Sequence, residues 1–209
     1  MNVEPLKPSP ILVTNEKKSR VLNRLGPVIA LTGICWAVFL VNNIFLGGHL
    51  SRYGIIPRHL SALPGIFWSP FLHSSFKHLA ANSVPLLVLG AMLCLRSKAE
   101  FSWVTLGGII VGGGLTWLFG RTAIHIGASG LVFCFFGYLA SLAFFKRNLV
   151  TIGLSLVCIL VYGGVLKGVL PNAGPVSWEG HLAGLLAGIT VAWVRSKEIT
   201  IAMPGVKTP

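Results

Sequence analysis

A serine between two glycines opens a long apolar stretch, at a place where its hydroxyl could act as a nucleophile. In "GASG", Gly127 and Gly130 flank Ala128 and Ser129, and apolar residues follow. Small neighbours leave a serine oxygen open to a substrate carbonyl. The first residues of a helix also carry unpaired N–H groups and the positive end of the helix dipole. A serine at a helix start is more often an N-cap, so this motif alone favours capping.

Two further motifs supply the other groups that such a nucleophile needs. His181 lies in "GHLAGLLAG", where small residues recur every four positions and predict a helix that packs closely on another membrane helix. If it packs on the helix that Ser129 opens, the imidazole can take the serine proton as a general base. His78 and Asn82 are four residues apart on one helix face, where both could donate to a developing oxyanion. Taken singly, these residues could equally be polar contacts between helices.

The composition indicates that these motifs belong to a membrane protein. The chain has 209 residues, 54% of them hydrophobic and 11% charged, against about 25% charged in an ordinary soluble domain. The formal net charge is +12, but the basic residues separate apolar runs instead of forming one patch. We therefore expect a lipid bilayer and no nucleic acid as partner. The four cysteines fall within apolar runs and favour neither a disulfide nor a zinc site.

Apolar runs of roughly the ~20 residues that cross a bilayer predict an all-α membrane protein with six transmembrane helices. The runs cover about 25–46, 78–95, 101–120, 128–145, 149–167 and 179–194. Residues 25–194 would form one domain between a flexible cytoplasmic tail, 1–24, and a second cytoplasmic tail, 195–209. The loop 47–77 mixes prolines with aromatic residues, so we expect short helices there, partly embedded in the outer surface.

The basic residues also predict the orientation of the chain. With both termini on one side, 12 of the 17 Lys and Arg residues fall on that side and the remaining 5 on the other. The excess places both termini in the cytoplasm. All six histidines then map to the outer loops or the outer ends of spans. Ser129, His181, His78 and Asn82 would share one depth near the outer face of the membrane, which we expect to be a bacterial cytoplasmic membrane.

Together the three motifs resemble those of the rhomboid intramembrane serine proteases. The matching stretches are "FLHSSFKHLAANSVPLLVLG", "GASG" and "GHLAGLLAG", and the resemblance covers most of residues 54–194. It implies a six-helix bundle with a Ser–His dyad in a water-filled cavity open to the outer face. The implied reaction is cleavage of single-span membrane proteins through an acyl-enzyme. When these motifs are matched to those of the family, the resemblance implies that Ser129 is the nucleophile and His181 the base. It implies that His78, Asn82 and the Ser129 backbone N–H form the oxyanion hole.

The orientation of the histidine is where this chain departs from the family pattern. Members often carry a tyrosine one turn after the serine, and here that position is Phe133. We expect the Phe133 ring to pack on His181 and to serve in place of the acidic residue that orients the histidine in soluble serine proteases. Glu179 lies two residues before His181, so we expect it in the outer loop, where it could cap the sixth span. We expect no cofactor and no metal.

Three other functions fit part of the sequence. A zinc protease could use the outward histidines, but the chain has no HExxH motif and few carboxylates. A small membrane transporter could use the glycine-rich run 107–114 as a broken helix, although close helix packing explains the run equally well. A catalytically inactive rhomboid-like protein would bind membrane proteins without cutting them. The presence of both Ser129 and His181 argues against that third function.

Overall fold

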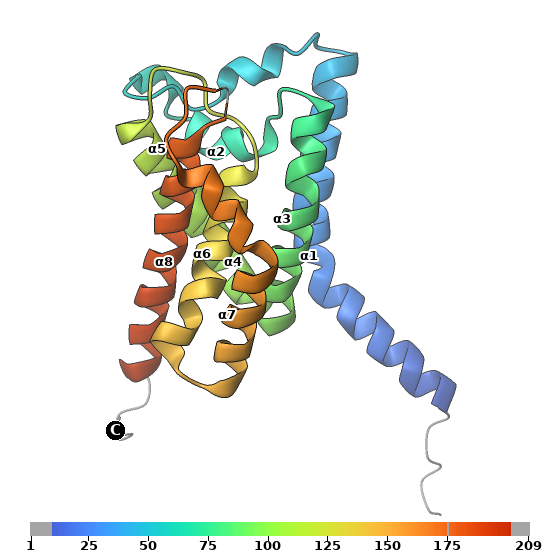
Figure 1. The fold of residues 1–209 in the computed structure, drawn as a ribbon. Helices are drawn as coiled ribbons and strands as arrows, with labels where there is room; N and C mark the ends of the chain where they lie inside the picture. Colours follow the sequence, from blue (N-terminus) through green and yellow to red (C-terminus); the bar gives the residue numbers. More distant parts are fainter. Residues whose placement is uncertain (1–9, 175, 202–209) are drawn as a thin grey trace, which may run out of the picture.

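The fold is a bundle of long helices whose connections at one end form a layer of short helices (Figure 1). The computed structural model describes residues 10–174 and 176–201. This part of the chain is helical and contains no β-strand, apart from a single bridge between Ile55 and His125. The long helices are α1 (Pro10–Ile44), α3 (Phe76–Arg96), α6 (Ser129–Lys146), α7 (Leu149–Tyr162) and α8 (Trp178–Ile201). A further long segment consists of α4 (Lys98–Gly107), the π-helical turn η4 (Gly108–Gly112) and α5 (Gly113–Phe119).

Helical segments of this chain are long and apolar enough to cross a bilayer, which confirms an all-α membrane protein. Among the described residues there are five: Ser19–Ile44, Phe76–Arg96, Lys98–Phe119, Ser129–Lys146 and Leu149–Val169. Helix α8 has 24 residues but does not join them, because Glu179, His181 and several glycines lower its hydropathy. The sixth span and the cytoplasmic location of both termini therefore stay predictions.

Helix α1 begins at Pro10, well before the start near residue 25 that the sequence predicts. Proline is favourable in the first turn of a helix, where its missing N–H would have no partner. Residues 10–24 of the predicted tail are therefore helical, while 1–9 and 202–209 lie outside the described residues. Pro27 lies within α1 and removes one backbone hydrogen bond. Figure 1 shows that α1 bends and that its first part leaves the bundle.

The connection between α1 and α3 consists of short helices, as predicted for residues 47–77. They are η1 (His49–Tyr53), η2 (Leu60–Ala62), α2 (Gly65–Trp68) and η3 (Ser69–Phe71). Their depth in the membrane stays a prediction. A further short helix, η5 (Gly163–Val169), follows α7 and leads to the segment before α8.

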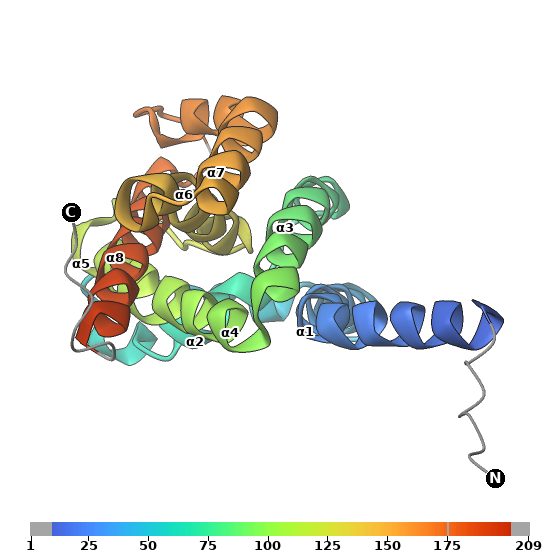
Figure 2. The same ribbon diagram turned by 90° about the horizontal axis from the view of Figure 1, so that it is seen from below.

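The core of the bundle forms around α6, which lies between α7 and α8 and is also contacted by α3 and α4 (Figure 2). Its buried side chains are mostly leucine and phenylalanine, and Tyr138 is fully buried among them. Helix α7, in contrast, turns most of its apolar side chains outward. A bilayer is the environment in which such a surface is stable.

Glycines allow α6 and α8 to pack with their backbones in contact. A Cβ atom on Gly184 would overlap the Gly130 carbonyl oxygen, and one on Gly188 would overlap the Cys134 carbonyl oxygen. On its other side, Gly184 faces Gly112 of η4, where a Cβ would be 3.4 Å from the Gly184 Cα. The glycine-rich run 107–114 thus belongs to a continuous helix that packs closely. It is not a broken helix, so the transporter interpretation loses its support.

Candidate active site

Ser129 is the first residue of α6, and its hydroxyl is not engaged in capping. Ala128 occupies the N-cap position, and no side chain caps the helix. The capping interpretation of Ser129 is therefore wrong. Neither its hydroxyl nor its backbone N–H forms a hydrogen bond within the described part of the chain. Gly127 has a φ of +116°, a backbone conformation that glycine adopts readily and other residues rarely do. It lies in the turn that leads into α6.

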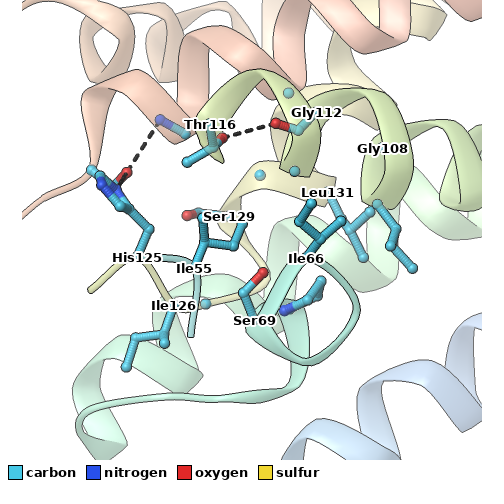
Figure 3. A pocket seen from close by; sticks show the side chains of 18 residues that line it. Ile55, Ile66, Ser69, Gly108, Gly112, Thr116, His125, Ile126, Ser129 and Leu131 are labelled. Carbon is cyan, nitrogen blue, oxygen red and sulfur yellow. Dashed lines mark hydrogen bonds between the residues drawn. The ribbon is translucent and has the colours of Figure 1, made fainter. Parts of the chain in front are cut away.

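The Ser129 hydroxyl faces a pocket that is lined largely by glycines and branched apolar side chains (Figure 3). The pocket has a volume of about 460 Å³, which includes space open to solvent. It lies among η4, α5, the start of α6 and the first turns of α8. Its polar side chains are Ser69, Thr116, His125, Ser129 and Ser177. Glycines of η4, α6 and α8 leave part of its wall free of side chains.

His181 lies in the first turn of α8, and two contacts hold its ring. The ring stacks on Phe133 with centroids 4.3 Å apart and an interplanar angle of 12°, which confirms the predicted stacking. Its Nδ1 is 2.9 Å from the Gly168 carbonyl oxygen. Since a carbonyl can only accept, Nδ1 carries the proton in the neutral ring and Nε2 carries the lone pair. His181 thus has the tautomer that a general base needs.

The nucleophile and base candidates lie on facing turns of α6 and α8. A Cβ on Gly130 would be 3.7 Å from the Gly180 carbonyl oxygen, so the two helix starts are adjacent. No hydrogen bond joins Ser129 to His181 among the residues that the structure describes. Catalytic hydrogen bonds are often long before substrate binds and tighten in the complex.

His78 and Asn82 lie on the first turns of α3, beside the backbone that precedes Ser129. A Cβ on Gly127 would be 2.6 Å from His78 Nε2 and 3.4 Å from Asn82 Nδ2. Asn82 is 8% exposed, and its Nδ2 is buried without a hydrogen-bond partner. Buried amide nitrogens almost always have a partner. Among the described residues none supplies that partner for Asn82 Nδ2.

His73 belongs to this cluster, although the sequence motifs do not single it out. Its ring is 5.1 Å from that of His78, and its Nε2 accepts the Ala128 N–H at 3.3 Å. Gly127 N–H donates to the Ser69 carbonyl at 2.8 Å. Burial, and then the charge of His78, lowers the pKa of His73 to about 4. A neutral His73 thus holds the chain in place just before Ser129. Its position five residues before His78 is the sequence signal that could have indicated it.

A comparison with protein families identifies the family of this chain. A family model described as the Rhomboid domain matches residues 61–198. The chain belongs to the rhomboid family. This rhomboid is similar to an uncharacterized protein of Mycobacterium tuberculosis (strain ATCC 25618 / H37Rv). The two are 37% identical over 178 residues, which cover 81% of this chain and 74% of that protein.

Two further bacterial proteins are similar to this rhomboid. An uncharacterized protein of Mycobacterium leprae (strain TN) is 39% identical over 192 residues, 87% of this chain and 76% of that protein. A protein of Bacillus subtilis (strain 168) named "Putative rhomboid protease YdcA" is 28% identical over 192 residues, 84% of this chain and 92% of that protein. The family and the apolar helices together make the chain an integral membrane protein with bacterial relatives.

The predicted place of Glu179 is wrong for this rhomboid. Glu179 lies in the first turn of α8, not in a loop, and is 9% exposed. Burial is possible because Arg121 compensates the charge, with Nε 3.5 Å from Glu179 Oε1. Ser177 takes the predicted capping role instead, since its Oγ accepts the Gly180 N–H at 3.1 Å. The other Glu179 oxygen is buried without a partner.

Proposed function

We propose that this rhomboid is an intramembrane serine endopeptidase that cleaves single-span membrane proteins within or near their transmembrane segment. Ser129 is the nucleophile and His181 the general base. His78, Asn82 and the Ser129 backbone N–H form the oxyanion hole. The Asn82 amide is the observation that carries the proposal, because its Nδ2 is buried, faces Gly127 and has no partner. If Asn82 only joined helices, that nitrogen would donate to a protein oxygen.

The proposed mechanism follows the geometry of these groups. Ser129 Oγ attacks the substrate carbonyl carbon while His181 Nε2 takes the hydroxyl proton. In this proposal the N–H donors of His78, Asn82 and the Ser129 backbone stabilise the negative charge on the carbonyl oxygen. His181 then gives its proton to the leaving amine as the C–N bond breaks, and an acyl-enzyme remains. Water, activated by the same imidazole, releases the acyl group.

We propose a dyad, in which no carboxylate orients the base. Glu179, although close in sequence, forms its ion pair with Arg121. The ring of His181 is held by Phe133 and by the Gly168 carbonyl instead. These two contacts supply what an acidic residue supplies in soluble serine proteases, namely a fixed tautomer and a fixed ring plane. Phe133→Ala should therefore lower kcat, because the ring loses its platform.

The proposed topology has six spans, with α8 as the sixth and both termini in the cytoplasm. Helix α8 is long enough to span, and its small residues pack on α6. Ser129 and His181 then lie near the outer face of a bacterial cytoplasmic membrane. Reporter fusions test this arrangement: those at the C-terminus and near Arg147 should read cytoplasmic, and one within 170–177 should read outside. An outside reading at the C-terminus would refute the orientation.

The decisive experiment is labelling of the purified full chain with a serine-reactive fluorophosphonate, with the adduct located by mass spectrometry. We expect the adduct on Ser129 and none in Ser129→Ala or His181→Ala. Ser141→Ala is the matched control, because it removes a hydroxyl from the same helix that donates only to the Tyr138 carbonyl. It should label as the wild type does.

Cleavage of a single-span substrate in proteoliposomes then tests the reaction itself. Ser129→Ala should abolish cleavage, and Asn82→Ala should reduce kcat by about 10²–10³, the usual cost of one oxyanion donor. Full cleavage by Ser129→Ala would end the protease proposal at this site. Labelling without cleavage of any membrane substrate would point to a rhomboid that binds membrane proteins and does not cut them.

A further inference from the structure

Arg121 holds the segment that leads into α8, where His181 lies. The residue belongs to the connection between α5 and α6. Its guanidinium donates to three backbone carbonyls, those of Asn172 at 2.8 Å, Gly174 at 2.8 Å and Val176 at 2.7 Å. Its Nε forms the ion pair with Glu179 in the first turn of α8. The Arg121 guanidinium thus directs most of its N–H donors to this segment and to the first turn of α8.

His125, four residues further along the same connection, makes the second link to this segment. Its Nε2 is 3.0 Å from the Arg121 carbonyl, which can only accept, so Nε2 carries the proton. Its Nδ1 then accepts from the Ser177 hydroxyl at 2.6 Å. Ser177 Oγ in turn accepts the Gly180 N–H and so caps α8. The chain of bonds runs from the connection before Ser129 to the first turn of the helix that carries His181.

Within the described fold, this segment has one further link, to η5, where the Leu170 N–H donates to the Lys167 carbonyl at 3.3 Å. Every other described hydrogen bond or ion pair that reaches residues 170–174, 176 and 177 from outside the segment and the first turn of α8 involves Arg121 or His125. The remaining bonds are internal, such as Gly174 N–H to Asn172 Oδ1. The described hydrogen bonds between this segment and the connection before α6 therefore all come from these two side chains.

We propose that Arg121 is a positioning residue for the proteolytic reaction. It fixes the chain ahead of His181 against the chain ahead of Ser129, and so sets the position of the imidazole relative to the serine. The inference rests on the proposed function, since it assigns Arg121 a role only through Ser129 and His181. Misplacement of a catalytic group by about 1 Å can cost as much as 10²-fold in rate. Even partial release of the segment should therefore slow the chemical step.

Arg58 offers a matched control on the same end of the bundle. Its guanidinium also donates to two backbone carbonyls, those of Leu118 at 3.2 Å and Gly120 at 2.8 Å. These bonds tie the connection after α1 to the end of α5 and do not reach the segment before α8. Arg58→Ala thus removes one positive charge and comparable hydrogen bonds without releasing His181. It reports what a loss of stability alone does to the reaction.

The test uses the full chain in detergent and measures three quantities for each variant: the rate of fluorophosphonate labelling at Ser129, kcat and KM for a single-span substrate, and the thermal midpoint. Arg121→Ala should lower the labelling rate and kcat by about tenfold, with KM changed by less than about twofold. Arg58→Ala should also lower the thermal midpoint, with labelling within about twofold of the wild type. Arg121→Lys should recover part of the rate, because an ammonium replaces the charge beside Glu179 but lacks the planar fork.

The outcomes separate this inference from the proposed function. A wild-type chain without an adduct on Ser129 would refute the proposed function, and the inference with it. If the wild type is labelled and Arg121→Ala is labelled equally fast, only the positioning role fails. It also fails if Arg58→Ala, at an equal loss of stability, slows labelling as much. Should Arg121→Ala not fold, Ser177→Ala breaks the second link, and wild-type labelling of that variant would refute the role of these links.

Discussion

Gly184→Ala tests the packing that places the two candidate catalytic residues on facing helices. The added Cβ would overlap the Gly130 carbonyl oxygen and lie 3.0 Å from the Gly130 carbonyl carbon and 3.2 Å from its Cα. These are backbone atoms and cannot rotate away. On the other side of α8, Gly112 of η4 already packs against Gly184. Helix α8 has to move from α6 by roughly 1 Å before the atoms reach ordinary contact distance.

The expected cost follows from that displacement. Overpacking a well-packed interior costs about 1–3 kcal/mol, which lowers the thermal midpoint by about 2–4 °C per kcal/mol for a chain of this size. The same shift moves His181 away from Ser129, so labelling at Ser129 should slow by about 10²-fold. Thermal unfolding in detergent and the labelling rate measure the two effects separately.

Gly153→Ala is the control for a glycine in the same kind of helix. A Cβ there has no neighbour within 4 Å, so alanine should be neutral or stabilise the protein by about 0.4–1 kcal/mol. Labelling at Ser129 should not change. If Gly184→Ala melted and labelled as Gly153→Ala does, the two backbones would not be in contact, and the reasoning from glycine packing would be refuted.

Three further predictions concern side chains around the site and the core. The pKa of His73 falls from 6.5 to about 4 on folding, so its stability contribution is present above pH 6.5 and is lost as the pH falls to 4. This contribution amounts to about 3 kcal/mol. His73→Gln should therefore make the thermal midpoint less dependent on pH over that range. Tyr138→Phe removes the O–H that donates to Glu100 Oε1 at 2.7 Å and should cost about 1–3 kcal/mol in unfolding experiments. Glu179→Gln keeps an oxygen for Arg121 and should keep most of the activity; a loss on the order of 10⁴ in kcat would instead reveal a triad.

Hydropathy and spacing in the sequence determined the class of the protein and the places of most helices. Helices α3, α6 and α7 begin within a few residues of the predicted spans, because an apolar run long enough to cross a bilayer satisfies its backbone only as a helix. The stacking of Phe133 on His181 was expected from the resemblance to the rhomboid motifs, because Phe133 stands where family members often carry a tyrosine. For the helices a local pattern is sufficient, and no distant contact has to be known.

Only the tertiary structure decided the placement of charged and polar groups between distant segments. Glu179 is buried in the first turn of α8 because Arg121, far away in the sequence, compensates its charge. His73 holds the backbone before Ser129 because the loop after η3 returns to the start of α6. Hydropathy is a property of each residue, whereas an ion pair or a hydrogen bond depends on which segments meet, and only the packed bundle brings those segments together.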